Sequence, residues 1–202
     1  MKKNSLIVLE GIDGSGTSTQ IALLEDLLTN EGFKVKVSAE PTKSVIGLEI
    51  RKLLASKQPS SNEKFAQLAL LFAADRMTHV NEVLLPSLHE YDFVILDRYV
   101  MSSFVYQGLS QPIEWVMNIN SYAISPDLTI VLDIDEKEAI KRLSVRQTTK
   151  DFFEEEQILK NLRKRYLYFA SLDSQKNVVL DACGEKNEIL SQIYGLIAQR
   201  FM

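Results

Sequence analysis

Eight residues near the N-terminus, Gly11 to Ser18, have the composition and spacing of a loop that binds phosphate groups. Their three glycines allow left-handed or crowded backbone conformations, so that successive N–H groups can face an anion. An apolar run precedes the segment and a helical pattern follows it, and the N-terminus of such a helix adds a partial positive charge. The segment therefore predicts a binding site for nucleotide phosphates, formed by Gly11, Asp13, Gly14, Ser15, Gly16, Thr17, Ser18 and Thr19.

One position of this loop departs from the usual pattern. Gly-x-x-x-x-Gly-Lys-[Ser/Thr] has a lysine before its last hydroxyl residue, and here Thr17 takes that place. Ser18 keeps the hydroxyl that would coordinate Mg²⁺ beside the terminal phosphates. A glycine-rich turn that binds nothing is the alternative interpretation, and the strand–loop–helix context argues against it.

A second polar segment, residues 97–108, follows another apolar run. Asp97, at the end of a predicted strand, can hold Mg²⁺ directly or through water. Arg98 can bridge a donor and an acceptor phosphate and neutralise the charge that develops between them. Two pairs of polar residues lie one helical turn apart, namely Ser102 with Tyr106 and Ser103 with Gln107. A surface ion pair beside a core aromatic residue is the alternative.

A third set of residues, Leu68, Phe72 and Arg76, recurs at intervals of four and lies on one face of a predicted helix. Phe72 could present its ring to a flat base, and Arg76 could hydrogen-bond the edge of that base or a phosphate. By itself this pattern favours the simpler interpretation, because a phenylalanine within an apolar helix usually belongs to the core.

The elements that must position these residues alternate between short apolar runs and longer helical patterns. The runs at 5–10, 34–38, 93–96, 128–132 and 178–180 predict buried parallel strands. The helical patterns cover 17–31, 44–56, 63–89, 100–108, 112–123, 136–146, 154–171 and 186–200. Together they predict one α/β domain over residues 1–202, a three-layer fold with a five-stranded parallel sheet flanked by helices.

In such a sheet, ligands bind beyond the carboxyl ends of the strands. The first three predicted strands lead into the phosphate loop, into Glu40 and Pro41, and into Asp97 and Arg98. The topology therefore predicts that all of these polar segments meet at one edge of the sheet.

Composition excludes some classes of protein. A net charge of −4 argues against a sequence-independent nucleic-acid binder, which needs a basic face. No apolar stretch is long enough to predict a membrane span. The single cysteine, Cys183, cannot form an internal disulfide; we expect it to be a small buried residue near a strand end, in a cytoplasmic protein.

These segments together resemble the thymidylate kinase family, the P-loop nucleoside-monophosphate kinases that phosphorylate dTMP with ATP. The most specific pieces are Phe72-Ala73-Ala74-Asp75-Arg76 and the segment from Asp97-Arg98-Tyr99 to Tyr106-Gln107-Gly108. Further matching pieces are Leu9 to Gly16, Glu40-Pro41-Thr42, Ile50-Arg51, Pro126 to Thr129, Leu132-Asp133 and Val179 to Ala182. The resemblance spans nearly the whole chain and implies a P-loop fold with a mobile lid, here at about residues 144–155.

The resemblance also implies roles for matching positions. Phe72 would stack on the thymine ring, and Arg76 and Ser103 would contact its polar edge or the adjacent acceptor groups. Tyr106 would favour deoxyribose, Asp13 would bind the 3′-hydroxyl, and Arg51 and Arg98 would hold the acceptor phosphate. Ser18 and Asp97 would serve Mg²⁺, and Glu40, Pro41, Ser102 and Gln107 complete the expected substrate site. The family typically forms homodimers, so we expect one here.

Three departures limit this transfer: Thr17 for the loop lysine, Ala39 where many members have arginine, and Phe152 for a lid arginine. Members that, like this chain with Gly14, lack a loop arginine usually supply one from the lid. Arg142, Arg146 and Lys150 remain as cations there, and we predict that Arg146 is catalytic, with a solvated helix-end arginine as the alternative. Other interpretations are a kinase for another deoxynucleotide such as dUMP, a catalytically disabled nucleotide-binding homologue, or a structural or oligomerisation module.

Overall fold

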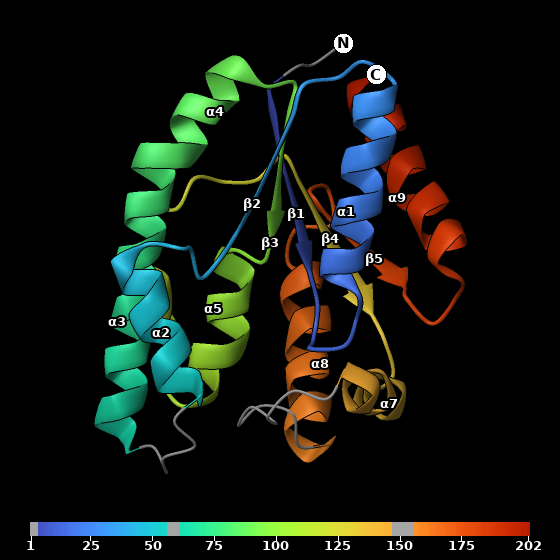
Figure 1. Cartoon of the computed structure of the whole chain (residues 1–202). Coiled ribbons are helices and arrows are strands. Elements are labelled where there is room, and N and C mark those ends of the chain that lie inside the picture. The colour runs from blue at the N-terminus through green and yellow to red at the C-terminus, as the bar shows by residue number, and fades with distance from the viewer. Residues whose placement is uncertain (1–3, 56–60, 147–155) are drawn as a thin grey trace.

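The structure, a computed structural model, describes residues 4–55, 61–146 and 156–202, without the side chain of Arg146 (Figure 1). Its sheet consists of β1 (Ser5–Glu10), β2 (Val35–Ala39), β3 (Phe93–Asp97), β4 (Leu128–Asp133) and β5 (Asn177–Asp181). The strands lie in the order β2-β3-β1-β4-β5, and every pair is parallel. The predicted α/β fold with a five-stranded parallel sheet is confirmed.

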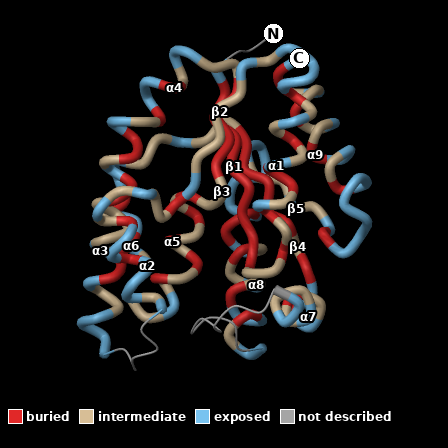
Figure 2. Tube along the Cα trace, in the orientation of Figure 1, coloured by how far each residue is buried: buried red, intermediate tan, exposed pale blue. Residues whose placement is uncertain are grey.

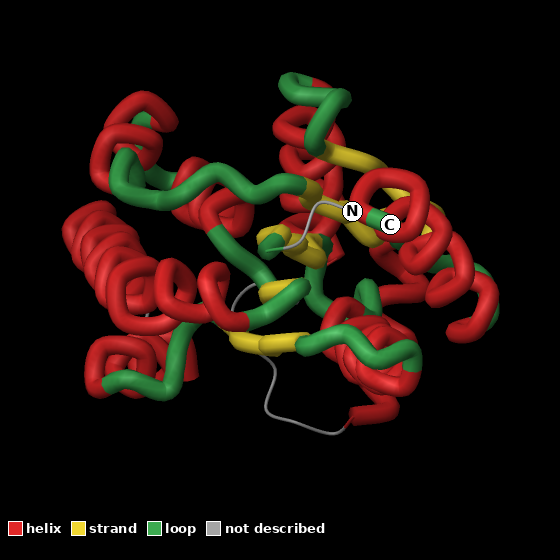
Figure 3. The backbone as a smooth tube through the Cα atoms, turned by 90° about the horizontal axis from the view of Figure 1, so that it is seen from above, coloured by secondary structure: helices red, strands yellow, loops and turns green. Residues whose placement is uncertain are grey.

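Helices cover both faces of this sheet, as the view in Figure 3 shows. They are α1 (Thr17–Asn30), α2 (Val45–Ala55), α3 (Asn62–His79), the π-helical η1 (Val80–Leu84), α4 (Leu85–Glu90), α5 (Val100–Tyr106), the 3₁₀ turn η2 (Gln107–Leu109), α6 (Ile113–Ile119), α7 (Glu136–Arg146), α8 (Glu156–Ser171) and α9 (Lys186–Phe201).

Two predicted helices differ from those observed. The predicted helix 63–89 is three consecutive segments, in which the Leu85 N–H bonds the carbonyl of Val80, five residues back. This wider turn lies just before Pro86, which has no N–H with which to continue the regular pattern. The predicted helix 112–123 ends at Ile119, because Asn120 leaves the helix and turns its side chain into the interior.

The core follows from the alternation of side chains along the strands. Ile7 and Leu9 of β1 pack with the apolar faces of α1 and α9, whereas Leu6 and Val8 pack with η1 on the other face. Figure 2 shows the strands buried at the centre, with the exposed residues of the helices facing outward. Because β1 is central and covered on both sides, all six of its residues are buried.

The register of the strands places the polar loops that follow β1, β2 and β3 at the same height along the sheet. Leu9 of β1 and Ala39 of β2 are both paired with Asp97 of β3. The residues that follow these three positions therefore emerge side by side at the carboxyl edge of the sheet, as the topology predicts.

The prediction for Cys183 was wrong, since its side chain is exposed. It lies one residue beyond the buried Ala182, in the loop that leaves the edge strand β5. Within the three described ranges, no helix is both long and apolar enough to cross a bilayer.

Candidate functional site

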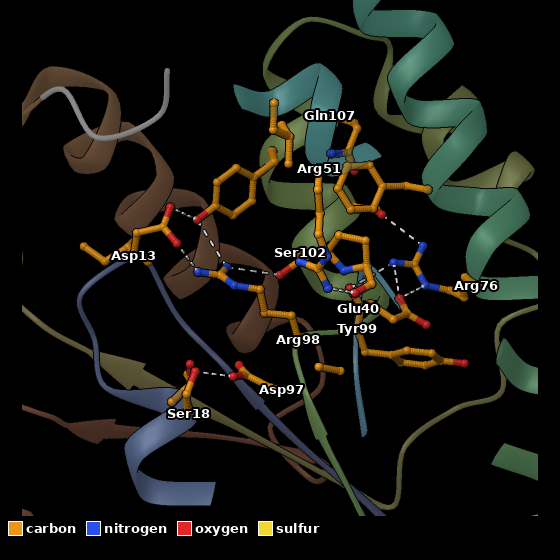
Figure 4. A pocket seen from close by; sticks show the side chains of 18 of the residues that line it. Asp13, Ser18, Glu40, Arg51, Arg76, Asp97, Arg98, Tyr99, Ser102 and Gln107 are labelled. Carbon is orange, nitrogen blue, oxygen red and sulfur yellow. Dashed lines mark hydrogen bonds and ion pairs between the residues drawn. The ribbon is translucent and has the colours of Figure 1, made fainter. Parts of the chain in front are cut away.

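A cavity of about 320 Å³ opens at the carboxyl ends of β1, β2 and β3. It brings together most of the residues predicted for the site, namely Asp13, Gly14, Gly16, Thr17, Ser18, Glu40, Pro41, Arg51, Phe72, Arg76, Asp97, Arg98, Ser102, Ser103, Tyr106 and Gln107. Three residues of the phosphate loop, Gly11, Ser15 and Thr19, are not part of its lining. Figure 4 shows Asp13 with Arg98, Ser18 with Asp97, and Glu40 with Arg76 as three groups around this space.

The phosphate loop has the backbone conformation that an anion site requires. Gly14 and Gly16 have φ angles of 87° and 95°, in the left-handed region. A Cβ atom on Gly14 would lie 2.7 Å from the carbonyl oxygen of Ala139, so α7 packs directly on the loop. The N-cap residue of α1 is Gly16, which has no side chain to cap the helix, and this leaves the first N–H groups of α1 available to a phosphate.

Ser18 and Asp97 form the pair predicted for a metal ion. The Ser18 hydroxyl donates to a carboxylate oxygen of Asp97 over 2.5 Å, from the first turn of α1 to the end of β3. Both are hard oxygen ligands beside the phosphate loop, and Mg²⁺ prefers such ligands together with phosphate oxygens and water. The residues present therefore fit a Mg²⁺–nucleotide complex.

Arg98 lies at the centre of the site, where its guanidinium group donates to four of the described side chains. One nitrogen, Nη2, donates to Asp13 over 2.6 Å. The other, Nη1, donates to the hydroxyls of Tyr166 at 3.0 Å, Tyr106 at 3.2 Å and Ser102 at 3.4 Å. The phosphate loop, α5 and α8 thus converge on one guanidinium group.

The backbone and the charge of Arg98 are both unusual. Its φ angle of 66° lies in the left-handed region, which a residue with a Cβ seldom adopts and which is found preferentially at functional sites. Burial alone would lower the pKa of this guanidinium, but the surrounding Tyr106 and Asp13, together with Tyr166 and Glu10, raise it above its ordinary value. Arg98 therefore remains a cation that can neutralise a transferred phosphoryl group.

Arg76 is buried, with a side chain only 2% exposed. Its Nε and Nη2 contact one carboxylate oxygen of Glu40 at 2.8 and 2.7 Å, and Nη1 donates to Ser103 at 2.9 Å and to Asn120. Nη2 also donates to the carbonyl of Tyr99 at 3.2 Å. Through these contacts the guanidinium group holds α3, α5, the end of α6 and the loop after β2 around the cavity, which Arg76 also lines.

Two further residues support this pair. His79 lies one helical turn after Arg76, and its Nδ1 is 3.0 Å from the second carboxylate oxygen of Glu40. Its Nε2 lies 2.8 Å from the Ser38 hydroxyl. Asp75, beside Arg76 in sequence, accepts the N–H of Thr42 at 2.7 Å and so holds the loop that follows Pro41. The pattern of α3 predicted Arg76 but missed the supporting His79 and Asp75.

Another wall of the cavity offers a place for a flat ring. Phe72 is half-buried and lines the cavity one helical turn before Arg76. Gln107 is buried, and its amide oxygen Oε1 has no hydrogen-bond partner among the described residues. A buried acceptor without a partner is costly, so this oxygen is suited to an N–H group of a ligand.

Beside the phosphate loop, Arg142 is a cation of α7 that lies near Gly16. Its Nη1 lies 3.9 Å from the point where a Cβ atom on Gly16 would stand, while Nη2 donates to the carbonyl of Ala182 at 3.0 Å. Arg163 is neutralised by Asp133, at 2.6 and 2.9 Å. Arg146 ends α7, but its side chain is outside the described part of the structure, as are Lys150, Phe152 and most of the predicted lid.

Sequence reasoning missed three other residues of the site. Glu10 accepts hydrogen bonds from Ser102 and Tyr166, and Asn120 binds Arg76. An acidic residue at the end of an apolar run, directly before the glycine loop, could have drawn attention to Glu10. Tyr166 and Asn120 lie far along the chain with no local pattern, and only the fold brings them here.

Comparison with known proteins agrees with this geometry. A sequence model of the thymidylate kinase family matches residues 9–193. A probable thymidylate kinase of Pyrococcus horikoshii is 37% identical over 201 residues, covering 97% of each chain. Probable thymidylate kinases of Methanosphaera stadtmanae and Methanobrevibacter smithii are 40% and 39% identical, covering 93% and 95% of this chain and 94% and 93% of their own.

Proposed function

This chain belongs to the thymidylate kinase family, and we propose that it transfers the γ-phosphate of ATP to the phosphate of dTMP, with Mg²⁺ bound to the nucleotide. The observation that carries the proposal is the position of Arg98 in the cavity. It lies between the phosphate loop, through Asp13, and the residues of α5. A cation in that position can contact both the donor and the acceptor phosphate.

On the acceptor side, each part of dTMP has a suitable group. Phe72 would stack on the thymine ring, and the Gln107 amide oxygen would accept its N3–H. Tyr106, whose hydroxyl donates to Asp13 at 3.2 Å, would border the sugar, with Asp13 on the 3′-hydroxyl. Arg51, which lines the cavity and donates to the carbonyl of Pro41, would join Arg98 on the acceptor phosphate.

The reaction itself needs alignment and charge more than covalent chemistry from the protein. An oxygen of the acceptor phosphate attacks the γ-phosphorus as the bond to the ADP oxygen breaks, and no general base is needed because that phosphate is already ionised. Mg²⁺ held at Ser18 and Asp97 would neutralise charge on the donor phosphates. We further propose that Arg146, at the end of α7, supplies the charge that the loop lacks at Thr17.

The test is a coupled assay of ADP release from ATP, Mg²⁺ and dTMP. We expect dTMP-dependent turnover, and a fall of about a hundred- to a thousandfold in the Arg98→Ala variant. If ADP release with dTMP does not exceed that of Arg98→Ala, the proposal is wrong. Nucleotide binding by calorimetry without turnover would identify a disabled homologue, and faster turnover with dUMP or dCMP would identify another acceptor.

We also propose that the protein is a homodimer that works in the cytoplasm. Apolar side chains are exposed on neighbouring helices, including Val45 (85%) and Leu48 (53%) on α2 and Leu70 (51%) and Met77 (44%) on α3. A solution mass of twice 22.9 kDa, reduced to one chain by Leu48→Lys with Leu70→Lys, would support it. A single-chain mass for the unaltered protein would contradict it. The exposed thiol of Cys183 suits a reducing compartment.

A further inference from the structure

One buried carboxylate of the site has no part in the proposed reaction. Glu10 is the last residue of β1, directly before the phosphate loop, and it is 0% exposed. Such a group is costly to bury unless its oxygens are satisfied. Burial raises the pKa of Glu10, and this is opposed by the hydrogen bond from Ser102 and by the charge of Arg98.

One carboxylate oxygen of Glu10 holds the start of α5. Its Oε1 accepts the backbone N–H groups of Tyr99 at 2.9 Å and of Ser102 at 3.1 Å. Tyr99 is the N-cap residue of α5 and Ser102 lies in its first turn, and α5 has no side-chain cap from its own N-cap residue. Glu10 therefore acts as a cap supplied by another element, and it sets where α5 begins relative to the phosphate loop.

The other oxygen reaches the residues that hold Arg98. Glu10 Oε2 lies 2.6 Å from the Ser102 hydroxyl and 3.2 Å from the Tyr166 hydroxyl, and both donate to it. The same two hydroxyl oxygens accept hydrogen bonds from Nη1 of Arg98. The two hydroxyl oxygens also lie 2.8 Å from each other. With their hydrogens directed at the Glu10 carboxylate, their lone pairs are left to face the guanidinium group.

We propose that Glu10 is a positioning residue for Arg98, which it holds through Ser102 and Tyr166; this rests on the proposed kinase function. Arg98 is held on both sides. Nη2 contacts Asp13, which lines the cavity, and Nη1 contacts the two hydroxyls in front of Glu10. When the acceptor phosphate and sugar engage Nη2 and Asp13, Nη1 keeps its partners. Glu10 thus allows the guanidinium group to exchange one ligand without losing its orientation.

The test compares Glu10→Gln with Asp127→Asn. In Glu10→Gln the new amide oxygen would still accept from the start of α5, but the amide NH₂ would face the two hydroxyls and reverse their hydrogen bonds. We expect kcat to fall by about ten- to a hundredfold, with the KM for ATP within about twofold of the original value. The Asp127 carboxylate accepts the N–H of Leu6 over 3.0 Å at the opposite end of β1, so Asp127→Asn should leave kcat within about twofold.

A double-mutant comparison separates positioning from general damage. In an Arg98→Lys background, which keeps a charge but loses the forked geometry, Glu10→Gln should lower kcat by less than about twofold. An equal fall in both backgrounds, or no fall in either, would overturn the proposal. If Glu10→Gln does not fold, Tyr166→Phe removes one link without adding a buried donor, and it should show the same dependence on Arg98 with a smaller fall.

A crystal structure of Glu10→Gln gives a readout that does not need turnover. We expect α5 to begin at Val100 as before while the Arg98 guanidinium moves away from Ser102 and Tyr166. An unmoved guanidinium would contradict the role of Glu10 even if the unaltered protein does not phosphorylate dTMP. Absence of turnover in the unaltered protein would contradict the proposed function and leave this structural test in force.

Discussion

The two halves of the cavity differ in what forms them: side-chain networks on the acceptor side, and backbone groups on the donor side. On the acceptor side, Arg76 and Arg98 are each enclosed by several side chains from separate elements, and the pair of Arg76 with Glu40 is almost completely buried. On the donor side, the phosphate loop relies on the backbone of Gly14 and Gly16 and on the start of α1. Backbone N–H groups remain when a side chain is substituted. In a buried side-chain network, by contrast, substitution of one residue leaves the hydrogen-bonding groups of the others without a partner.

This difference explains why a departure at Thr17 is compatible with an otherwise intact site. The glycines of the loop keep the left-handed conformation expected of a phosphate loop without the lysine, so the loop lacks the charge of that side chain but not the backbone geometry. A comparable loss on the acceptor side would leave buried carboxylates without a cation, which costs folding free energy as well as activity. The two halves should therefore differ sharply in their response to substitution.

The largest expected effect is on stability and comes from Arg76→Ala. Removal of this cation leaves the buried Glu40 carboxylate without its arginine partner, so the free energy of unfolding should fall by about 3–5 kcal/mol. Arg163→Ala on the donor side is the matched control, because its ion pairs with Asp133 are partly exposed, and it should cost about 1 kcal/mol or less. Urea unfolding followed by circular dichroism measures both. Similar losses for the two variants would show that the halves do not differ in this way.

Asp97→Asn tests whether the donor side depends on a side chain at all. Because the amide keeps the shape but not the charge, the Mg²⁺ concentration for half-maximal rate should rise by about ten- to a hundredfold. Titration of Mg²⁺ in the coupled assay measures this, with the KM for dTMP as the internal control. An unchanged Mg²⁺ requirement would mean that Asp97 only orients Ser18, with which it shares a hydrogen bond.

The smallest expected effect is an increase in activity. Thr17→Lys adds the missing cation to a loop that already has the correct backbone, and kcat/KM for ATP should rise by about tenfold. Thr17→Gln, which adds length without charge, is the control and should give no gain. If Arg146 already supplies the charge, the gain should be larger in an Arg146→Ala background, and equal gains in both backgrounds would argue against that role.

Much of this protein could be predicted from local pattern. The alternation of apolar runs and helical segments predicted the positions of β1 to β5 closely. The signal is strongest at β1, β3 and β4, because a strand covered on both faces needs a continuous apolar run, whereas the edge strands β2 and β5 are only partly buried. The phosphate loop and the stretch from Asp97 to Gln107 were also visible, since the residues that line one cavity there lie close together in the chain. Cys183 shows the limit: its place near a strand end was correct, but exposure depends on what covers an edge strand.

The residue types and their spacing were enough to predict the proposed chemistry: a glycine loop for phosphates, a hydroxyl and a carboxylate for a metal ion, and arginines for an acceptor. The way those arginines are held depends instead on the folded chain. Glu10, Asn120 and Tyr166 come from three distant parts of the sequence, and their contacts depend on strand register and helix packing. The partners of a buried ion are those that the fold brings close in space, so local spacing does not reveal Asn120 or Tyr166 as partners of these arginines.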